Sequence, residues 1–285
     1  MSTTDRLRKL LDGPEILIVP GCFDALTAKL IERAGFPAAF MSGFAVSASR
    51  LGQPDTGLIS YGEMVDQGSN ICSAVSIPVF GDGDTGYGNA INVRRTVQGY
   101  ARAGFACIMI EDQVSPKRCG HTRGKQTVSR GQAFARIQAA VDARSEGADI
   151  LIMARTDARA TVGLEEAVYR AGKFFEMGAD ITFLEAPLNE EEMRAYCDNV
   201  PGPCMANMVE QGDTPILSPA GLQEIGYKIV AYPLTLMLSG IQAMESAISA
   251  LQDGNRPRTL ADFEHLREIV GFPEYYEAER NYAAD

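Results

Sequence analysis

The segment Ile150-Leu-Ile-Met-Ala-Arg-Thr-Asp157 joins an apolar run to a charged end. Its first five residues have the length and composition of a strand that is buried on both faces. Short runs of the same kind, rich in apolar and β-branched residues, recur along the chain. Together they predict eight strands, at residues 16–19, 38–42, 79–82, 107–111, 150–154, 181–185, 203–207 and 229–232.

Longer segments with apolar residues at helical spacing separate these runs, for example at 25–34, 93–103, 130–143 and 164–177. Eight strand–helix units in 285 residues predict an α/β fold, a (β/α)8 barrel of typical length. A doubly wound sheet is the alternative, but no Gly-x-Gly-x-x-Gly turn follows the first strand. We expect one barrel domain over 1–285, with an N-terminal helix at 2–11 and a C-terminal helical extension over 252–285.

The composition argues against several classes of protein. A formal net charge of -11 does not suit a nucleic-acid-binding surface. No apolar run approaches the roughly 20 residues that span a bilayer, and the N-terminus lacks the apolar core of a secretory signal. The six cysteines form no Cys-x-x-Cys pair, which argues against a disulfide framework or a structural zinc site. We therefore expect a cytoplasmic protein with no nucleic-acid or membrane partner.

Polar residues follow six of the predicted strands. In a (β/α)8 barrel the C-terminal ends of the strands meet at one face, and that face carries the active site. Helix capping or a turn explains any one of these polar ends, but not easily all six. The side chains expected to converge there include Ser42, Asp82, Asp84, Glu111, Arg155, Glu185 and Asn207.

The stretch Gly81-Asp-Gly-Asp-Thr-Gly-Tyr-Gly88 supplies a candidate metal site. Asp82 and Asp84 are two residues apart, so on a strand both carboxylates project from one face. The spacing does not fit a calcium loop, which would need glycine at Tyr87. Carboxylates among glycines suit a Mg2+ ion that keeps several waters, with Glu111 completing its shell. An Asp-Gly turn without a metal is the alternative.

The stretch Lys117-Arg-Cys-Gly-His121 surrounds a thiol with cationic side chains, which favours the thiolate electrostatically. It lies in a polar, irregular segment at 116–125, directly after the fourth predicted strand. Such a segment is typical of a mobile lid, and a lid that carries an acid could deliver a proton to a carbanion. The alternative is an exposed basic loop with an incidental cysteine.

Two further strand ends could bind carboxylates. The guanidinium of Arg155 could take a carboxylate bidentately, although an ion pair with Asp157 or Glu185 is the alternative. Ser42 and the backbone N–H groups of Gly43 and Phe44 could form a small anion-binding nest, and a plain strand-to-loop turn remains open there.

At these residues the chain resembles the isocitrate lyase and phosphoenolpyruvate mutase superfamily, from about residue 10 to residue 251. The cysteine stretch at 117–121 looks like the lyase signature of that superfamily. Its metal and substrate motifs are similar to Gly81–Asn89, Ile110–Gln113 and Ala154–Ala158 of this chain. The segment 51–57 looks like a further loop of the superfamily, which makes Asp55 a candidate site carboxylate.

The resemblance implies a (β/α)8 enzyme that uses Mg2+, with Mn2+ as an alternative, and acts on a small carboxylate. It also implies a homotetramer, a dimer of dimers that exchange a C-terminal helix. The implied catalytic residues are Cys119, Lys117, His121 and Glu185, with Cys119 as the acid tuned by Lys117 and His121. The implied metal residues are Asp82, Asp84 and Glu111. The implied substrate-binding residues are Ser42, Gly43, Phe44, Asp55, Arg118, Gly120, Arg155 and Asn207.

The implied activity is that of a carbon–carbon lyase in carboxylic acid metabolism. It would cleave a 2-hydroxy di- or tricarboxylate, of the 2-methylisocitrate or 2,3-dimethylmalate type, into a 2-oxoacid and a carboxylate. The intermediate would be enolate-like and protonated by Cys119. A bulky Phe44 departs from the glycine-rich sequence expected of methylisocitrate lyases, which keeps a smaller malate-type substrate open. The alternatives are a carboxyphosphonoenolpyruvate phosphonomutase-type enzyme, an oxaloacetate hydrolase or decarboxylase, and a non-catalytic binding protein.

Overall fold

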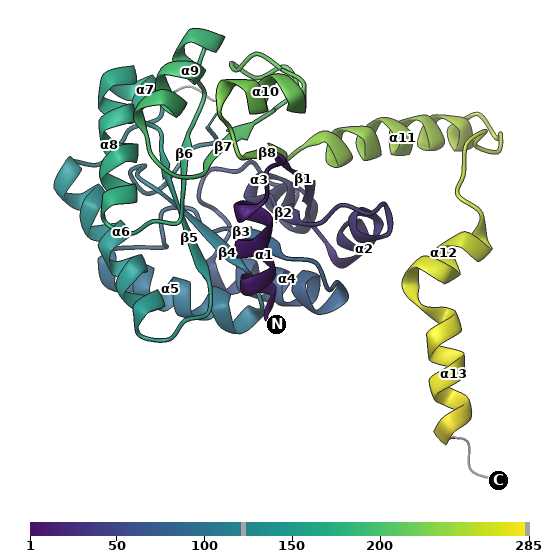
Figure 1. Ribbon diagram of the computed structural model, residues 1–285. Coiled ribbons are helices and arrows are strands. Elements are labelled where there is room, and N and C mark those ends of the chain that lie inside the picture. The colour runs from purple at the N-terminus through teal and green to yellow at the C-terminus, as the bar shows by residue number, and fades with distance from the viewer. Residues whose placement is uncertain (121–123, 283–285) are drawn as a thin grey trace. The chain divides into compact units, whose positions relative to one another are not determined.

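A computed structural model describes residues 1–120 and 124–282, which fall into two compact units. The first unit, Met1–Thr235, holds a closed barrel of eight strands in the order β1 to β8 (Figure 1). The predicted (β/α)8 fold is confirmed, and each predicted strand is present with its ends shifted by at most three residues. The strands are β1 (Leu17–Cys22), β2 (Ala39–Met41), β3 (Val79–Asp82), β4 (Cys107–Glu111), β5 (Leu151–Thr156), β6 (Ile181–Leu184), β7 (Cys204–Asn207) and β8 (Ile229–Tyr232).

Helices connect the strands and lie outside them, as Figure 1 shows for α5, α6 and α8. Two short helices, α3 and α7, follow β2 and β5 closely at the face that carries the polar ends, and the π-helical turn η1 continues from α3. The helices of the first unit are α1 (Thr3–Asp12), α2 (Ala25–Arg33), α3 (Gly43–Val46), η1 (Ser47–Leu51), α4 (Tyr61–Ala74), α5 (Ala90–Ala103), α6 (Arg130–Ser145), α7 (Ala158–Thr161), α8 (Leu164–Glu176), α9 (Glu190–Asn199) and α10 (Pro219–Ile225).

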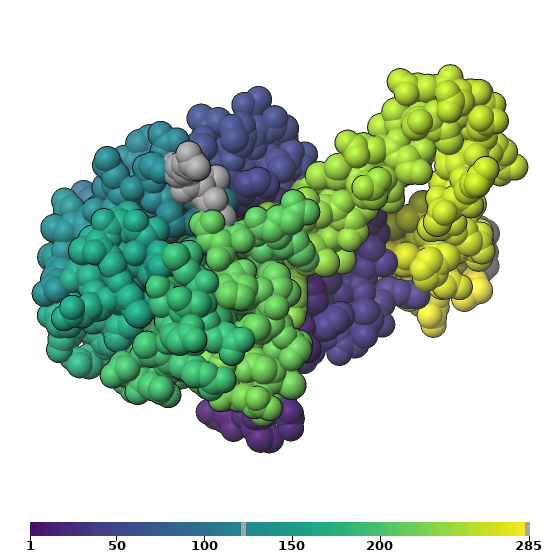
Figure 2. All heavy atoms as spheres, turned by 90° about the horizontal axis from the view of Figure 1, so that it is seen from above, coloured from purple at the N-terminus to yellow at the C-terminus, as the bar shows by residue number. Residues whose placement is uncertain are grey.

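The strands pair in parallel around the ring, and β8 returns to pair with β1. In the view from above in Figure 2, green segments late in the first unit accordingly adjoin purple segments from its beginning. The register places Glu111 of β4 beside Arg155 of β5, so two charged strand ends meet at the same level. All residues of β3, β4, β5 and β6 are buried, which explains their continuous apolar runs.

The barrel interior is filled by side chains from alternate positions of the strands, as expected for this fold. These side chains form one cluster with residues of α1, where Leu7 is fully buried. The hydroxyl of Thr4 on α1 also donates a 3.0 Å hydrogen bond to the carbonyl of Asp149, just before β5 begins. The predicted N-terminal helix therefore packs at the end of the barrel where the strands begin, away from the polar strand ends.

The second unit comprises residues 236–285, which places its boundary earlier than the extension predicted to begin at residue 252. It contains most of α11 (Thr235–Gln252), with α12 (Phe263–Val270) and α13 (Phe272–Tyr282). Within the helical extension predicted over 252–285, α12 ends at Gly271, whose φ is 90°. Exposed apolar side chains recur at helical spacing on α11, including those of Ile241 and Ile248. In the described part of the chain, no helix combines the length and apolarity needed to cross a membrane.

Candidate active site

The two aspartates predicted from the third strand lie together at its end. Asp82 is the last residue of β3, and its Oδ1 accepts a 3.0 Å hydrogen bond from the backbone N–H of Asp84. Its Oδ2 accepts a 3.2 Å hydrogen bond from the N–H of Gly43. The backbone N–H of Glu111 donates to the carbonyl of Asp84 at 2.9 Å, which joins the ends of β3 and β4. These hydrogen bonds bring the three predicted metal residues into one region, and all three acids are buried.

Lys117 meets these acids. Its Nζ lies 2.5 Å from Oδ1 of Asp55 and 2.9 Å from Oδ1 of Asp84, and the lysine side chain is only 5% exposed. Burial alone would lower the pKa of Lys117, but the carboxylates of Asp84 and Asp55 outweigh it and hold this pKa well above its ordinary value. Burial raises the pKa of Asp84 to about 7, against the opposing effect of Lys117. The ammonium thus contacts acids from two other loops.

Arg155, at the end of β5, is surrounded by carboxylates. Its Nε and Nη2 donate to Asp157 at 2.9 and 3.0 Å. Nη2 also lies 3.1 Å from Oε2 of Glu185, and Nε lies 3.3 Å from Oε2 of Glu111. Asn207 Nδ2 donates to the other oxygen of Glu185 at 3.4 Å. The ion pairs with Asp157 and Glu185 that were the alternative for Arg155 are therefore formed.

The candidate anion nest after β2 is used within the protein. Ser42 Oγ accepts a 3.3 Å hydrogen bond from the N–H of Ala45 and caps α3. The N–H of Gly43 is directed to Asp82, where a Cβ on residue 43 would lie 2.5 Å from Oδ2 of that carboxylate. The alternative of a strand-to-loop turn accounts for these contacts, while Phe44 lines the pocket.

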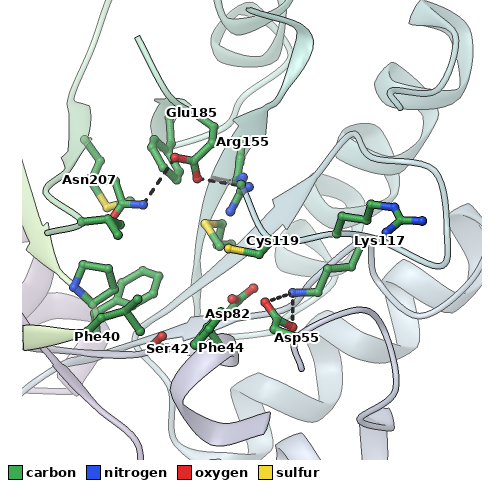
Figure 3. A pocket seen from close by; sticks show the side chains of 18 residues that line it. Phe40, Ser42, Phe44, Asp55, Asp82, Lys117, Cys119, Arg155, Glu185 and Asn207 are labelled. Atoms are coloured by element: carbon green, nitrogen blue, oxygen red, sulfur yellow. Dashed lines mark hydrogen bonds and ion pairs between the residues drawn. The ribbon is translucent and has the colours of Figure 1, made fainter. Parts of the chain in front are cut away.

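The cysteine segment, residues 117–120 in the described part of the chain, reaches across the barrel mouth. Figure 3 shows Cys119 between Asp82 and Lys117 on one side and Arg155 and Glu185 on the other. The backbone of the next residue, Gly120, packs so closely that a Cβ there would lie 2.6 Å from both Arg155 Nη2 and Glu185 Oε2. Cys119 is partly buried and Arg118 is exposed, although both border the pocket. His121, the remaining member of the predicted set, lies outside the described residues.

The pocket has two chemically different parts. Carboxylates and their cations form one part, and a second part is apolar. Apart from Phe44, this apolar wall had no signal in the sequence, because buried strand residues and the short segment after β8 look like ordinary core. It consists of Phe40, Phe44, Met109, Phe183, Met205, Val209, Pro233 and Leu234.

The acidic part suits a hard divalent cation. Among the described residues, no three acidic, histidine or cysteine side chains are placed to hold a metal ion by direct contact. The donors are nevertheless of the right kind, because Oε1 of Glu111 is buried and receives no hydrogen bond from the described residues. Mg2+ is commonly bound through one or two carboxylates, with waters and substrate oxygens as its other ligands. Asp82, Asp84 and Glu111 fit that mode.

The phosphoenolpyruvate phosphomutase family matches residues 7–252 of the chain. The chain belongs to this family. The resemblance inferred from the sequence motifs is confirmed. A family relative, the 2,3-dimethylmalate lyase of Eubacterium barkeri, is 44% identical over 287 residues, with 99% of each chain covered. This similarity supports the expectation of an enzyme of the carbon–carbon lyase class.

Solved structures of similar proteins agree with the fold. Oxaloacetate acetylhydrolase bound to 3,3-difluorooxalacetate superimposes with a TM-score of 0.96 at 33% identity, covering 100% of this chain and 98% of that one. Phosphonopyruvate hydrolase in complex with oxalate and Mg2+ superimposes with a TM-score of 0.88 at 30% identity, covering 99% of each chain. This similar structure thus holds Mg2+ and a small dicarboxylate.

Proposed function

We propose that this protein is a Mg2+-dependent lyase that cleaves a 2-hydroxy di- or tricarboxylate, of the 2,3-dimethylmalate or 2-methylisocitrate type, into a 2-oxoacid and a carboxylate. The observation that carries this proposal is the position of Cys119 between the acidic group of Asp82 and the Arg155–Glu185 pair. A thiol in that position can protonate a carbon that lies across the pocket.

Each group has a proposed role. Asp82 and Asp84, with Glu111 nearby, would hold Mg2+, which would supply positive charge to the oxygens of the 2-hydroxy acid and lower the pKa of its hydroxyl. The hydroxyl proton would pass to a carboxylate of the acidic part. Mn2+ is an alternative ion. Breaking the bond between carbons 2 and 3 leaves an electron pair beside the departing carboxylate, where it is delocalised as an enolate. Cys119 then donates its proton to that carbon.

The remaining residues would bind and orient the substrate. Arg155 and the Ser42–Gly43 turn would hold the 2-oxoacid half, and Glu185 with Asn207 would orient the departing carboxylate. Both members of this last pair are already joined by a 3.4 Å hydrogen bond, which supports a joint role. Asp55 keeps Lys117 in the acidic part, and the backbone of Gly120 closes against Arg155. His121 and Lys117 would tune the acid, and Arg118 would bind at the pocket border.

The family relationship supports further expectations. We propose a homotetramer, arranged as a dimer of helix-swapped dimers, and a cytoplasmic location. Size-exclusion chromatography with light scattering would test the assembly. A monomer at micromolar concentration would contradict it.

A product assay tests the activity. The protein is incubated with 2,3-dimethylmalate, 2-methylisocitrate, isocitrate, oxaloacetate and phosphonopyruvate, with Mg2+ or with EDTA, and 2-oxoacids, oxalate and phosphate are measured separately. We expect a 2-oxoacid from a malate-type substrate, abolished by EDTA and reduced at least about 100-fold in Cys119→Ser. Cys72→Ser is the matched control, because Cys72 is a partly buried cysteine of α4 outside the pocket.

Oxaloacetate hydrolysis is the second candidate, favoured by the close superposition on oxaloacetate acetylhydrolase. Oxalate and acetate from oxaloacetate, with no 2-oxoacid from any malate, would replace the lyase proposal with this one. Turnover of a phosphonate alone would favour a phosphonomutase-type enzyme.

A further inference from the structure

Gln113 binds the backbone of the cysteine segment on one side of Cys119. Its Nε2 donates a 2.8 Å hydrogen bond to the carbonyl of Arg118, and its Oε1 accepts a 3.0 Å hydrogen bond from the N–H of the same residue. One side-chain amide therefore occupies both backbone groups of Arg118, as a neighbouring strand would. Gln113 is only 1% exposed, so its side chain is fixed by the surrounding protein.

Lys125 binds the backbone on the other side. Its ammonium donates to the carbonyl of Gly120 and lies 3.4 Å from Oδ1 of Asp157, with 6% of the lysine side chain exposed. Asp157 is fully buried and accepts two hydrogen bonds from Arg155. The backbone N–H of Asp157 in turn donates to Asp112 at 2.9 Å. Lys125 thus connects the residue after Cys119 to the carboxylate that orients Arg155.

A separate set of contacts joins the two ends of the loop that carries Cys119. The N–H of Val114 donates to the carbonyl of Gln126 at 2.8 Å, and Gln113 forms an antiparallel bridge with Thr127. These contacts join the two arms near β4, several residues away from Cys119. The side chains of Gln113 and Lys125 act closer to the thiol, because they bind residues 118 and 120 directly.

We propose that Gln113 and Lys125 are positioning residues that hold the backbone on both sides of Cys119 and so set the place of its thiol beside Arg155. Lys125 makes this placement dependent on Asp157, so the segment and Arg155 are fixed together. The effect on turnover rests on the proposed function of Cys119 as the acid. The placement of the thiol does not rest on it.

The test measures the thiol directly. The full-length protein and the variants Gln113→Leu and Lys125→Met are treated with iodoacetamide, and the rate of Cys119 alkylation is followed by peptide mass spectrometry. Both variants should be alkylated about tenfold faster, because each loses hydrogen bonds that hold the backbone beside Cys119. Lys173→Met is the control, since Lys173 lies at the exposed face of α8 and pairs with Glu176.

Turnover and conservative variants separate positioning from general stability. At an unchanged melting temperature, kcat should fall by about 10- to 100-fold in both variants, as expected for a displaced reacting group. Gln113→Glu keeps the acceptor for Arg118 but loses the donor, and Lys125→Arg keeps a cation, so both should be alkylated at intermediate rates. Gln113→Glu and Lys125→Arg can be measured instead if Gln113→Leu or Lys125→Met does not fold.

Alkylation of Cys119 at the wild-type rate in the folded variants at both positions would overturn the proposal. If the protein has no lyase activity but alkylation is accelerated as expected, the positioning role stands and the proposed function fails. The two conclusions are therefore distinguishable.

Discussion

The ammonium nitrogen of Lys117 lies 2.9 Å from Oδ1 of Asp84, so a cation from the segment after β4 is buried against an acid that follows β3. The same ammonium contacts Asp55, whose Oδ1 is 2.5 Å away. Buried charges are stable only when they are paired, because each has lost its hydration. Lys117 therefore stabilises the acidic part of the pocket as well as bordering it.

Replacing Lys117 by methionine should destabilise the protein by about 3 kcal/mol, because it leaves the carboxylates of Asp55 and Asp84 buried without their cation. Mg2+ should restore more stability to this variant than to the wild type, since it supplies positive charge in the same region. Urea unfolding with and without Mg2+ measures both effects. The exposed Lys173→Met should change stability by less than about 0.5 kcal/mol. Equal stability of Lys117→Met and wild type would contradict the expectation.

Gly43→Ala should weaken the metal site. The new Cβ would lie 2.5 Å from Oδ2 of Asp82, so the carboxylate must move and lose its hydrogen bond from residue 43. We expect the Mg2+ concentration for half-maximal activity to rise by about tenfold. Gly62→Ala on α4 is the matched control, because its Cβ would meet no atom closer than 3.9 Å. An unchanged Mg2+ dependence in Gly43→Ala would argue against Asp82 as a metal residue.

The charge of Glu166 on α8 should stabilise the folded state near neutral pH, and this stabilisation should be lost in acid. Hydrogen bonds from Arg130 lower the pKa of Glu166 to about 2, against an ordinary value of 4.5, and Arg170 contributes in the same direction. A folded-state pKa below the unfolded one gives stability that is present above about pH 4.5 and is lost as the pH falls toward 2. Glu166→Gln should therefore be about 1 kcal/mol less stable than wild type near neutral pH.

The difference between Glu166→Gln and wild type should narrow as the pH falls from about 5 to about 3, in urea unfolding measured at a series of pH values. Glu176→Gln, on the same helix but paired with Lys173 at the surface, should stay close to wild type throughout. A difference that is constant with pH would show that the ion pairs of Glu166 do not contribute through its charge.

Phe44 should limit the size of the substrate, because it lies partly buried in the wall of the pocket. Phe44→Ala should raise the ratio of kcat/KM for 2-methylisocitrate to that for 2,3-dimethylmalate by about tenfold, the usual effect of a few methylene groups of added space. Phe44→Leu, which keeps much of the bulk, should change this ratio much less. A lower ratio in Phe44→Ala would mean that another residue sets the size limit.

Sequence alone determined the barrel and most members of the site. Short buried strands have a recognisable composition, and the fold places their C-terminal ends at one face, so Asp82, Glu111 and Arg155 could be assigned to it without coordinates. Asp55 followed only from resemblance to a family. His121 lies outside the described residues, and the proposed assembly and metal stay predictions.

Only the tertiary structure decided which charges meet. Lys117 and Asp55 are 62 positions apart in the chain and join at 2.6 Å, while Lys125 and Gln113 bind the backbone beside Cys119. Hydrophobic periodicity fixes which face a residue occupies, because it repeats along one element. A hydrogen bond between two loops depends on the path that each loop takes and on how deeply the pair is buried, because burial strengthens the interaction. The local sequence pattern predicts neither the path nor the burial.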